Sequence, residues 1–473
     1  MKPKKHSIVG NCTLTLLCAA LINHSAEAAS GTWNLDGNSV WNVATDPPWA
    51  GAIIADGTGD TAYFSTIDIT ADRTVSLDTV RTIGNLSFGD TNTGTAGGWI
   101  LNNNGNPANI LTLAGTPVIT VNALAAGKDA NISAVLTGTS GLTKSGAGTL
   151  TLSAANTYTG STTVNAGILK AGTSTAFGTA ANASIAFGPA TTGKVQLNNF
   201  DMTVVGLNSN TSVGTPIVEN GGANAKTLTI NNTVANTYAG IFQKGAAGNL
   251  SITKTGAGLL TLTGSSATTI GGNIIVDGGS LTLSSNGDLS NGNGTVGSTA
   301  PAGSVAVTVT GQGTKWTNSS YFRLGQSSTN NSLTISNGGV LTSAGNSAFS
   351  IGFNAGANNN TVTVTGNGSS LGYSDHFEVG RGGTGCTLNI ENGATATCFL
   401  FWSSGGRLNP NIGASSSTVK IDGFGSALNV TSSWDIADRG TGNQFKVING
   451  GTANMTGGGY VGYYTGNVEI TVD

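Results

Sequence analysis

Short runs in which Val, Ile or Leu alternates with Thr or Ser recur along most of the chain. The longest regular example, residues 141–172, reads GLTKSGAGTLTLSAANTYTGSTTVNAGILKAG. A period of two predicts strands that bury one face, and the Gly, Asn and Asp residues between the runs predict turns. In the N-terminal part the pattern predicts strands at Thr61–Phe64, Ile67–Ile69, Thr74–Leu77, Ile83–Phe88, Trp99–Leu101, Ile110–Leu113 and Val118–Val121.

The stretch at residues 141–153 has a second copy. Residues 251–263, SITKTGAGLLTLT, repeat its Lys, its Gly-Ala-Gly turn and its Leu-Thr-Leu triplet. Repeated strands separated by loops of variable length are typical of a solenoid, because loops project outward while strands must keep their register. Between the copies the pattern is weaker, and composition predicts strands at Lys194–Leu197, Val204–Val205 and Thr227–Ile230.

From about residue 303 a different repeat takes over. Its two motifs begin as VTVTGQG and LTISNGG, and each occurs three times, at residues 307–313, 362–368 and 419–425 and at residues 333–339, 388–394 and 445–451. Like copies therefore recur at a nearly constant period. We interpret the unit as about three short strands, with about 18–20 residues per turn of a β-helix. The stretch between the two repeat types, residues 286–303, is expected to be a long loop or a flexible joint.

Asn337, Asn392 and Asn449 recur at one turn of this second repeat. Asn adopts left-handed turn geometry readily and can form hydrogen-bonded ladders between rungs. The repeats therefore predict an all-β fold, a parallel β-helix or β-solenoid. An array of β-sandwich domains would instead show periods of about 90–100 residues and longer strands.

Three tryptophans, Trp33, Trp41 and Trp49, lie close together in the Gly-rich stretch that follows Ala28. The first turn of a solenoid has no neighbour on one side, so we interpret them as an N-terminal cap that covers the open end of the core. A platform on which sugars stack is the alternative interpretation.

Composition narrows the classes of partner. Only 9% of the residues are charged, Gly accounts for 73 residues, and the formal net charge is −3. No basic patch is present that could neutralise a nucleic acid or bind an anionic membrane. The recurring Val, Ile and Leu positions argue against a disordered low-complexity chain.

The N-terminal stretch, Met1–Ala28, is typical of a secretory signal peptide. Lys2, Lys4 and Lys5 precede a short apolar stretch at Ile8–Ile22, and Ala26-Glu27-Ala28 fits a signal-peptidase site. We expect cleavage after Ala28, and therefore export. Later apolar stretches are too short to span a membrane, so no membrane insertion is expected.

Beyond the expected cleavage site the chain has two cysteines, Cys386 and Cys398, and one histidine, His376. In an exported protein the cysteines could form a disulfide, and two unpaired buried thiols are the equal alternative. These side chains are too few for a zinc site. We expect no metal and no cofactor.

The stretch at residues 141–172, with its second copy at residues 251–263, resembles the autotransporter-associated β-strand repeat of large exported proteins of Gram-negative bacteria. The units that begin with VTVTGQG are similar to a second repeat of autotransporter passenger regions, and together the two types cover roughly Ile132–Asp473. The resemblance implies a right-handed parallel β-helix on the cell surface or outer membrane, or released from it, as a stalk or adhesin. It implies no activity, because the repeat is a scaffold.

The resulting organisation has four parts: a signal peptide at 1–28, a cap with the first turns at 29–125, a solenoid with two copies of the first repeat at 126–285, and a solenoid of the second repeat at 286–473. Autotransporters also carry an outer-membrane translocator barrel, and nothing in this sequence resembles one. Because the last motif stops where its Gly is due, we expect the sequence to be part of a longer protein.

The titratable residues form three sparse clusters: Asp375, His376, Glu378 and Arg381; Asp435, Asp438 and Arg439; and Asp56 and Asp60. In the first cluster, alternation predicts Phe377 and Val379 inward and His376 and Glu378 on the solvated face. The Gly-Ala-Gly turns lie between two strands rather than before a helix, so we interpret them as turns and not as phosphate loops. A single histidine makes a Ser or Cys triad improbable.

We therefore predict an exported structural or adhesive surface solenoid with no catalytic residues, whose partners are surface glycans or other cell-surface proteins and not nucleic acids. A carbohydrate-active β-helix enzyme is the first alternative, and it requires Asp375, Glu378, Asp435 and Asp438 to converge on one groove. A carbohydrate-binding module is the second, and it requires exposed rings among Trp33, Trp41, Trp49, Trp402 and Trp434.

Overall fold

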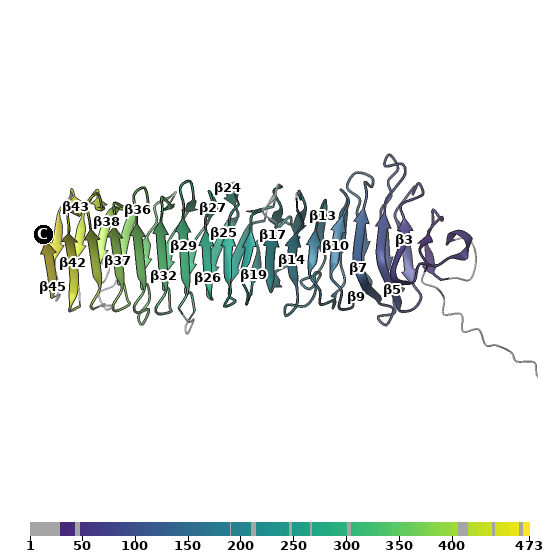
Figure 1. Ribbon diagram of the computed structural model, residues 1–473, viewed down its shortest axis with the longest axis horizontal. Coiled ribbons are helices and arrows are strands. Elements are labelled where there is room, and N and C mark those ends of the chain that lie inside the picture. Colours follow the sequence, from purple (N-terminus) through teal and green to yellow (C-terminus); the bar gives the residue numbers. More distant parts are fainter. Residues whose placement is uncertain are drawn as a thin grey trace, which may run out of the picture.

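The structure is a computed structural model that describes residues 29–42, 48–189, 191–209, 214–245, 248–264, 267–299, 304–343, 345–404, 415–437, 440–462 and 467–473. The chain is an elongated stack of short strands that runs from the first rungs to β45 (Val468–Val472) (Figure 1). Successive rungs pair in parallel. The predicted all-β solenoid is confirmed. The predicted signal peptide and its cleavage site at Ala28 lie outside the described residues.

The first side of the solenoid begins as one sheet and continues as another. The N-terminal sheet contains β1 (Gly31–Thr32), β3 (Gly57–Phe64), β5 (Arg81–Phe88), β7 (Leu111–Val121), β10 (Leu142–Ser145), β12 (Thr162–Val164), β14 (Ser184–Phe187) and β17 (Gly206–Ser209), with β9 (Leu136–Thr137) paired to β7. The C-terminal sheet contains β20 (Asn236–Tyr238), β23 (Leu259–Leu262), β26 (Ser280–Leu283), β29 (Ala306–Thr310), β32 (Ser332–Ser336), β35 (Thr361–Thr365), β37 (Thr387–Glu391), β39 (Thr418–Asp422), β42 (Asn443–Ile448) and β45.

The second side is formed in the N-terminal half by β2 (Ser39–Trp41), β4 (Arg73–Leu77), β6 (Trp99–Asn102), β8 (Ala130–Ile132), β11 (Thr149–Leu152), β13 (Ile168–Ala171), β15 (Lys194–Gln196), β18 (Ile217–Glu219) and β21 (Ile241–Gln243). A short 3-10 helix, η1 (Ala50–Ala52), precedes β3. Each of the early turns therefore contributes two main strands.

From β16 onward a third strand is added to each turn, and the remaining strands form one 17-stranded sheet. Its members are β16 (Met202–Val204), β19 (Lys226–Ile230), β22 (Leu250–Lys254), β24 (Ala267–Thr269), β25 (Gly271–Val276), β27 (Asp288–Asn291), β28 (Gly294–Val296), β30 (Lys315–Asn318), β31 (Phe322–Leu324), β33 (Val340–Ser343), β34 (Phe349–Ile351), β36 (Ser370–Val379), β38 (Thr395–Ser403), β40 (Ala427–Val430), β41 (Trp434–Ile436), β43 (Thr452–Met455) and β44 (Gly459–Val461).

Three N-terminal strand predictions differ from the structure. Residues 67–69 form no strand. Residues 111–113 of the predicted strand Ile110–Leu113 belong, with Val118–Val121, to the single strand β7. Residues 286–299 were expected to be a loop or a joint, but they contain β27 and β28. Short polar runs with Gly and Asn can continue a ladder when neighbouring rungs supply the hydrogen bonds.

The predicted turn length is wrong, because each turn is longer than expected. Val307 of the first motif pairs with Leu333 of the second motif, and Leu333 pairs in turn with Val362, where the first motif returns. The VTVTGQG and LTISNGG motifs are therefore equivalent strands on successive turns. The repeat unit that runs from one VTVTGQG copy to the next contains two turns.

The recurring turn asparagines behave as predicted. Asn337, Asn392 and Asn449 have φ angles of 53°, 57° and 52°, in the left-handed region. Each Nδ2 donates a hydrogen bond to the preceding rung, and that of Asn337 reaches Thr310 Oγ1 at 3.0 Å. These amides tie consecutive turns together at the end of the strand.

The N-terminal tryptophans form the cap. Trp33 and Trp41 are fully buried and Trp49 is 1% exposed. All three rings pack around Phe64, with centroid distances of 5.4–5.8 Å. A stacking platform for sugars needs exposed rings, so the alternative interpretation fails for these three residues.

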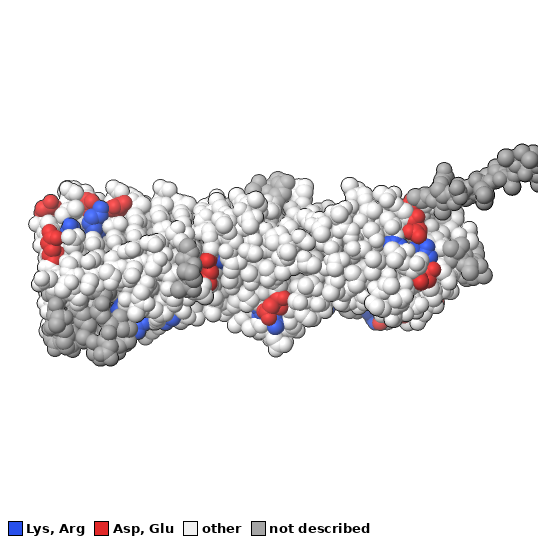
Figure 2. All heavy atoms as spheres, turned by 90° about the horizontal axis from the view of Figure 1, so that it is seen from below, with Lys and Arg blue, Asp and Glu red and all other residues white. Residues whose placement is uncertain are grey.

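Charged side chains gather in a few places on the surface, and long stretches of the face in Figure 2 carry none. Polar surface is supplied instead by the Thr, Ser and Asn residues at the outward positions of the strands, such as Thr308, Thr334 and Thr363, which are on consecutive rungs. The surface therefore has few charged groups that could attract a charged partner over a long distance.

Candidate functional site

A row of polar and aromatic side chains runs along the outer face of the 17-stranded sheet, over β31, β34, β36, β38 and β41. Strand register places one member on each successive rung. We call it the outer row, and it consists of Arg323, Ser350, Glu378, Trp402 and Asp435. The preceding residue on each strand is aromatic and faces the core, which fixes the outward direction of the row.

Most of the outer row is buried despite its position on the outer face. Ser350 is fully buried, Asp435 is 1%, Glu378 4% and Trp402 8% exposed. The prediction that Glu378 lies on a solvated face is therefore wrong. Alternation shows which side of the sheet a residue faces, but it does not show what covers that side.

Glu378 is held by side chains from two rungs. Its Oε2 accepts a hydrogen bond of 2.6 Å from Ser350 Oγ, and its Oε1 lies 3.4 Å from Arg381 Nε and 3.7 Å from His376 Nε2. The other ring nitrogen of His376, Nδ1, is 3.0 Å from Asp375 Oδ2. The structure thus brings together all four residues of the first predicted cluster.

Arg323 packs its guanidinium against aromatic rings. The guanidinium lies 3.9 Å from the ring centroid of Tyr321 and 3.5 Å from that of Phe353, and Arg381 lies 3.9 Å from the same Phe353 ring. Arg323 Nε is buried without a hydrogen-bond partner among the described residues. Burial, together with the neighbouring charge of Arg381, lowers the pKa of Arg323.

The arrangement does not favour hydrolysis. Glu378 and Asp435 share the outer row, two rungs apart, but Trp402 occupies the rung between them and packs against His376 with a centroid distance of 4.5 Å and the rings tilted by 40°. A pair of hydrolytic carboxylates needs open space between them for the sugar and, in inverting enzymes, for water. Asp438 and Arg439 lie outside the described residues.

Of the two N-terminal acidic residues, Asp56 binds the scaffold, whereas Asp60 Oδ2 is buried without a hydrogen-bond partner among the described residues. Asp56 accepts hydrogen bonds of 2.9 Å from Arg81 Nη1 and from the Thr82 amide. The pKa of Asp60 is raised by burial and by the neighbouring charge of Asp56. Across the described part of the chain, no group of three His, Cys, Asp or Glu residues could hold a metal ion.

The remaining candidates are also packed. Cys386 and Cys398 are both free, buried thiols, and burial raises the pKa values of the two groups to about 11 and about 12. Trp434 is half-buried, and its indole donates a hydrogen bond of 3.1 Å to Gly457 O. Neither Trp402 nor Trp434 presents the exposed ring that a sugar-stacking platform needs.

A buried lysine marks each copy of the first repeat. Lys144 is fully buried at an inward position of β10, and its Nζ donates to Ser145 O at 2.8 Å, Gly146 O at 2.8 Å and Ala166 O at 3.0 Å. Lys254 is 1% exposed on β22, and its Nζ donates to Gly256 O and, at 3.1 Å, to Gly278 O.

Each lysine therefore joins the Gly-Ala-Gly turn of its own rung to a turn of the next rung. Burial lowers the pKa of both ammonium groups to about 8. Gly146 has a φ of 76°, and a Cβ on Gly148 would lie 2.4 Å from Asn122 O, so the turn has no room for larger residues. These turns are packing elements, as predicted.

Residues 142–171 and 252–283, which include both lysines, match the passenger-associated transport repeat family. The chain is autotransporter passenger-like. A stretch of 163 residues is also 36% identical to the adhesin BmaC autotransporter of Brucella suis biovar 1 (strain 1330). That stretch covers 33% of this chain and 4% of the adhesin, so the chain spans a small part of its relative. No solved structure matches the chain.

Two features of this passenger-like chain were missed from the sequence. Arg323, Ser350 and Glu378 occupy equivalent positions in three copies of a Phe-x-Leu/Ile/Val-Gly motif, and this exchange of polar residues was the available signal for the outer row. Phe353 directly follows the middle copy, at the position that Gln326 and Arg381 occupy after the other two, so the motif did not indicate its contact with Arg323. Among the described residues, no helix has the length and apolar character needed to cross a membrane.

Proposed function

We propose that this chain is the adhesive or structural passenger of an exported surface protein and that it has no catalytic activity of its own. The observation that carries the proposal is the pair of passenger transport repeats, each of which forms rungs of one parallel solenoid. The printed name of the similar Brucella protein, an adhesin, supports an adhesive role. Surface glycans or other cell-surface proteins are the proposed partners, and nucleic acids are not.

Residues 1–28 are proposed to direct export, with cleavage after Ala28, and the mature chain then acts at the cell surface or outside the cell. The solenoid suits this role because its polar, charge-poor faces repeat from rung to rung. A long rigid scaffold can present one binding surface far from its point of attachment.

Adhesion can be tested with the purified mature chain, residues 29–473, coated on fluorescent beads. We expect these beads to bind cultured epithelial cells in larger numbers than beads coated with albumin, and soluble passenger to compete. Equal binding by the two kinds of bead would contradict the adhesive role.

Export is tested separately. The full sequence is expressed in a Gram-negative host, and the N-terminus of the exported product is determined by mass spectrometry. A product that begins at Ala29 is expected, whereas a product that remains uncleaved in the cytoplasm would contradict the proposed signal peptide.

A further inference from the structure

The first side of the solenoid is interrupted between β17 and β20. β14 pairs with β17 and β20 pairs with β23 in parallel ladders, but no backbone ladder joins β17 to β20, both of which are fully described. Side chains bridge the step instead. Asn236 Oδ1 accepts from the Leu207 amide at 3.3 Å, Asn208 Oδ1 from Thr237 at 3.2 Å and Ser209 Oγ from Ala239 at 2.6 Å.

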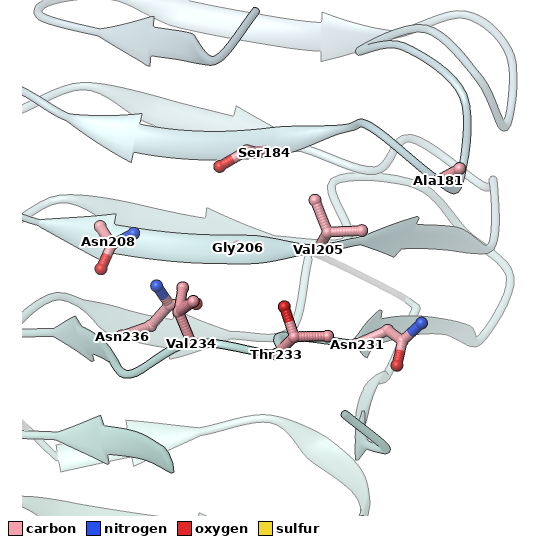
Figure 3. A pocket seen from close by; sticks show the side chains of 9 residues that line it. All are labelled: Ala181, Ser184, Val205, Gly206, Asn208, Asn231, Thr233, Val234 and Asn236. Atoms are coloured by element: carbon pink, nitrogen blue, oxygen red, sulfur yellow. The ribbon is translucent and has the colours of Figure 1, made fainter. Parts of the chain in front are cut away.

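A hollow of about 520 Å³ opens on the surface at this interruption. At this step side chains, rather than backbone carbonyls, accept the hydrogen bonds of the Leu207, Thr237 and Ala239 amides. The lining comes from three successive rungs (Figure 3). It comprises Ala181, Ser184, Val205, Gly206, Asn208, Asn231, Thr233, Val234 and Asn236.

None of the lining residues is charged. Amides and hydroxyls offer both donors and acceptors, as the hydroxyl groups of a sugar do. Among the described residues, no hydrogen bond uses Asn231 Nδ2, Thr233 Oγ1 or Ser184 Oγ, so these groups are available to a ligand. Val234 is 65% exposed and, with Val205, supplies methyl groups for the C–H face of a sugar ring.

Two other classes of ligand fit less well. An anionic or cationic ligand would find no opposite charge in the lining. An extended peptide would need free backbone groups at a sheet edge, but the amides of Leu207 and Thr237 are already occupied by Asn236 and Asn208. The volume lies in the range of sites for small ligands, about 300–1,000 Å³.

We propose that this hollow binds a neutral sugar unit of a glycan, through the side chains of Asn231, Thr233 and Ser184. The proposal rests on the adhesive role proposed above and identifies where on the passenger a glycan is bound. The flanking ladders of β14 and β23 hold the lining strands in place, so the site is formed before the ligand arrives.

The test uses residues 29–473 on an array of immobilised neutral and acidic oligosaccharides, followed by titration of the neutral sugar that binds best. The double variant Asn231→Ala, Thr233→Val removes two hydrogen-bonding groups at the rim. We expect it to bind about tenfold more weakly, as the loss of two neutral hydrogen bonds implies. Ala181→Trp places a bulky ring at the hollow and is expected to abolish binding.

Asn389→Ala is the matched control, since Asn389 is a half-buried asparagine on β37 of the same side, away from the hollow. It should leave sugar binding unchanged, and all variants should keep the thermal midpoint of the wild type. Binding confined to acidic sugars, unchanged binding by the double variant, or no binding to the array would each overturn the proposal. If the coated beads still bind cells in that case, the adhesive role stands and only this site is rejected.

Discussion

The transport repeats and the C-terminal outer row both bury charged groups, but they use them differently. Lys144 and Lys254 point inward and bind main-chain carbonyls of two consecutive turns. Glu378 and Arg323 lie on the outer face and contact other side chains, among them Ser350 and Phe353. The two lysines therefore stabilise the backbone conformation of the turns. Glu378 and Arg323 stabilise only the positions of side chains on one face of the sheet.

This difference has an energetic consequence. A buried carbonyl that loses its donor cannot find another, because the backbone around it is fixed by the ladder. A side chain that loses its partner can change rotamer and reach water when it lies near the surface. The same type of residue is thus expected to matter more for stability inside the transport repeats than in the outer row.

The largest effect is expected from replacing both lysines. Lys144→Met and Lys254→Met keep the apolar stem but remove the donors, so each should lower the free energy of unfolding by about 2 kcal/mol, within the range for unsatisfied buried groups. Urea unfolding followed by circular dichroism measures this. The two changes lie on rungs far apart and should be additive. A double variant as stable as the wild type would show that these lysines do not hold the turns.

A smaller effect is expected in the outer row. Glu378→Gln keeps an acceptor for Ser350 but removes the charge near Arg381, and it should cost about 1 kcal/mol in the same unfolding experiment. Lys226→Ala is the control, because it removes an ion pair with the largely exposed Asp201 and should change stability by less than about 0.5 kcal/mol. A loss at Glu378 as large as that at Lys144 would remove the distinction between the two regions.

A dependence on pH is a separate expected effect of the same two lysines. The pKa of each buried lysine is lowered to about 8, below its value in the unfolded chain, so between these values the unfolded state binds more protons than the folded state. Stability should therefore rise as the pH increases from 7.5 to 9.5. The thermal midpoint of the wild type should rise relative to that of the double Met variant. Parallel midpoints across this pH range would contradict the lowered pKa values.

The sequence was sufficient for the elements that repeat. Alternation and the two copies of the first repeat predicted the solenoid, and the position of Trp33, Trp41 and Trp49 predicted the cap. The turn length was misjudged because VTVTGQG and LTISNGG look like different motifs, although both place apolar residues at the same inward positions. The distance in sequence between two copies of the same motif corresponds to two turns of the solenoid, and we had read it as the length of one repeat unit.

Features that depend on contacts across rungs were not predictable in this way. The burial of Glu378 depends on what covers the sheet. Phe353 occupies a repeat position at which the neighbouring copies have Gln326 and Arg381, so the repeat does not predict an aromatic ring there. The hollow beside Asn231 lies at the step where Asn208 and Asn236 replace backbone partners, and nothing in the alternation distinguishes these asparagines from those of ordinary turns.

The interruption between β17 and β20 also affects how the molecule resists mechanical force. Tension along the long axis of a solenoid pulls directly on the hydrogen bonds between rungs, because these bonds run parallel to that axis. At the other steps of the first side a backbone ladder shares the load. At this step three side-chain bonds take its place, while the ladders of β18 with β21 and of β19 with β22 join the same two turns on the other sides. On its first side, a solenoid of this design therefore resists tension least at the step beside the hollow.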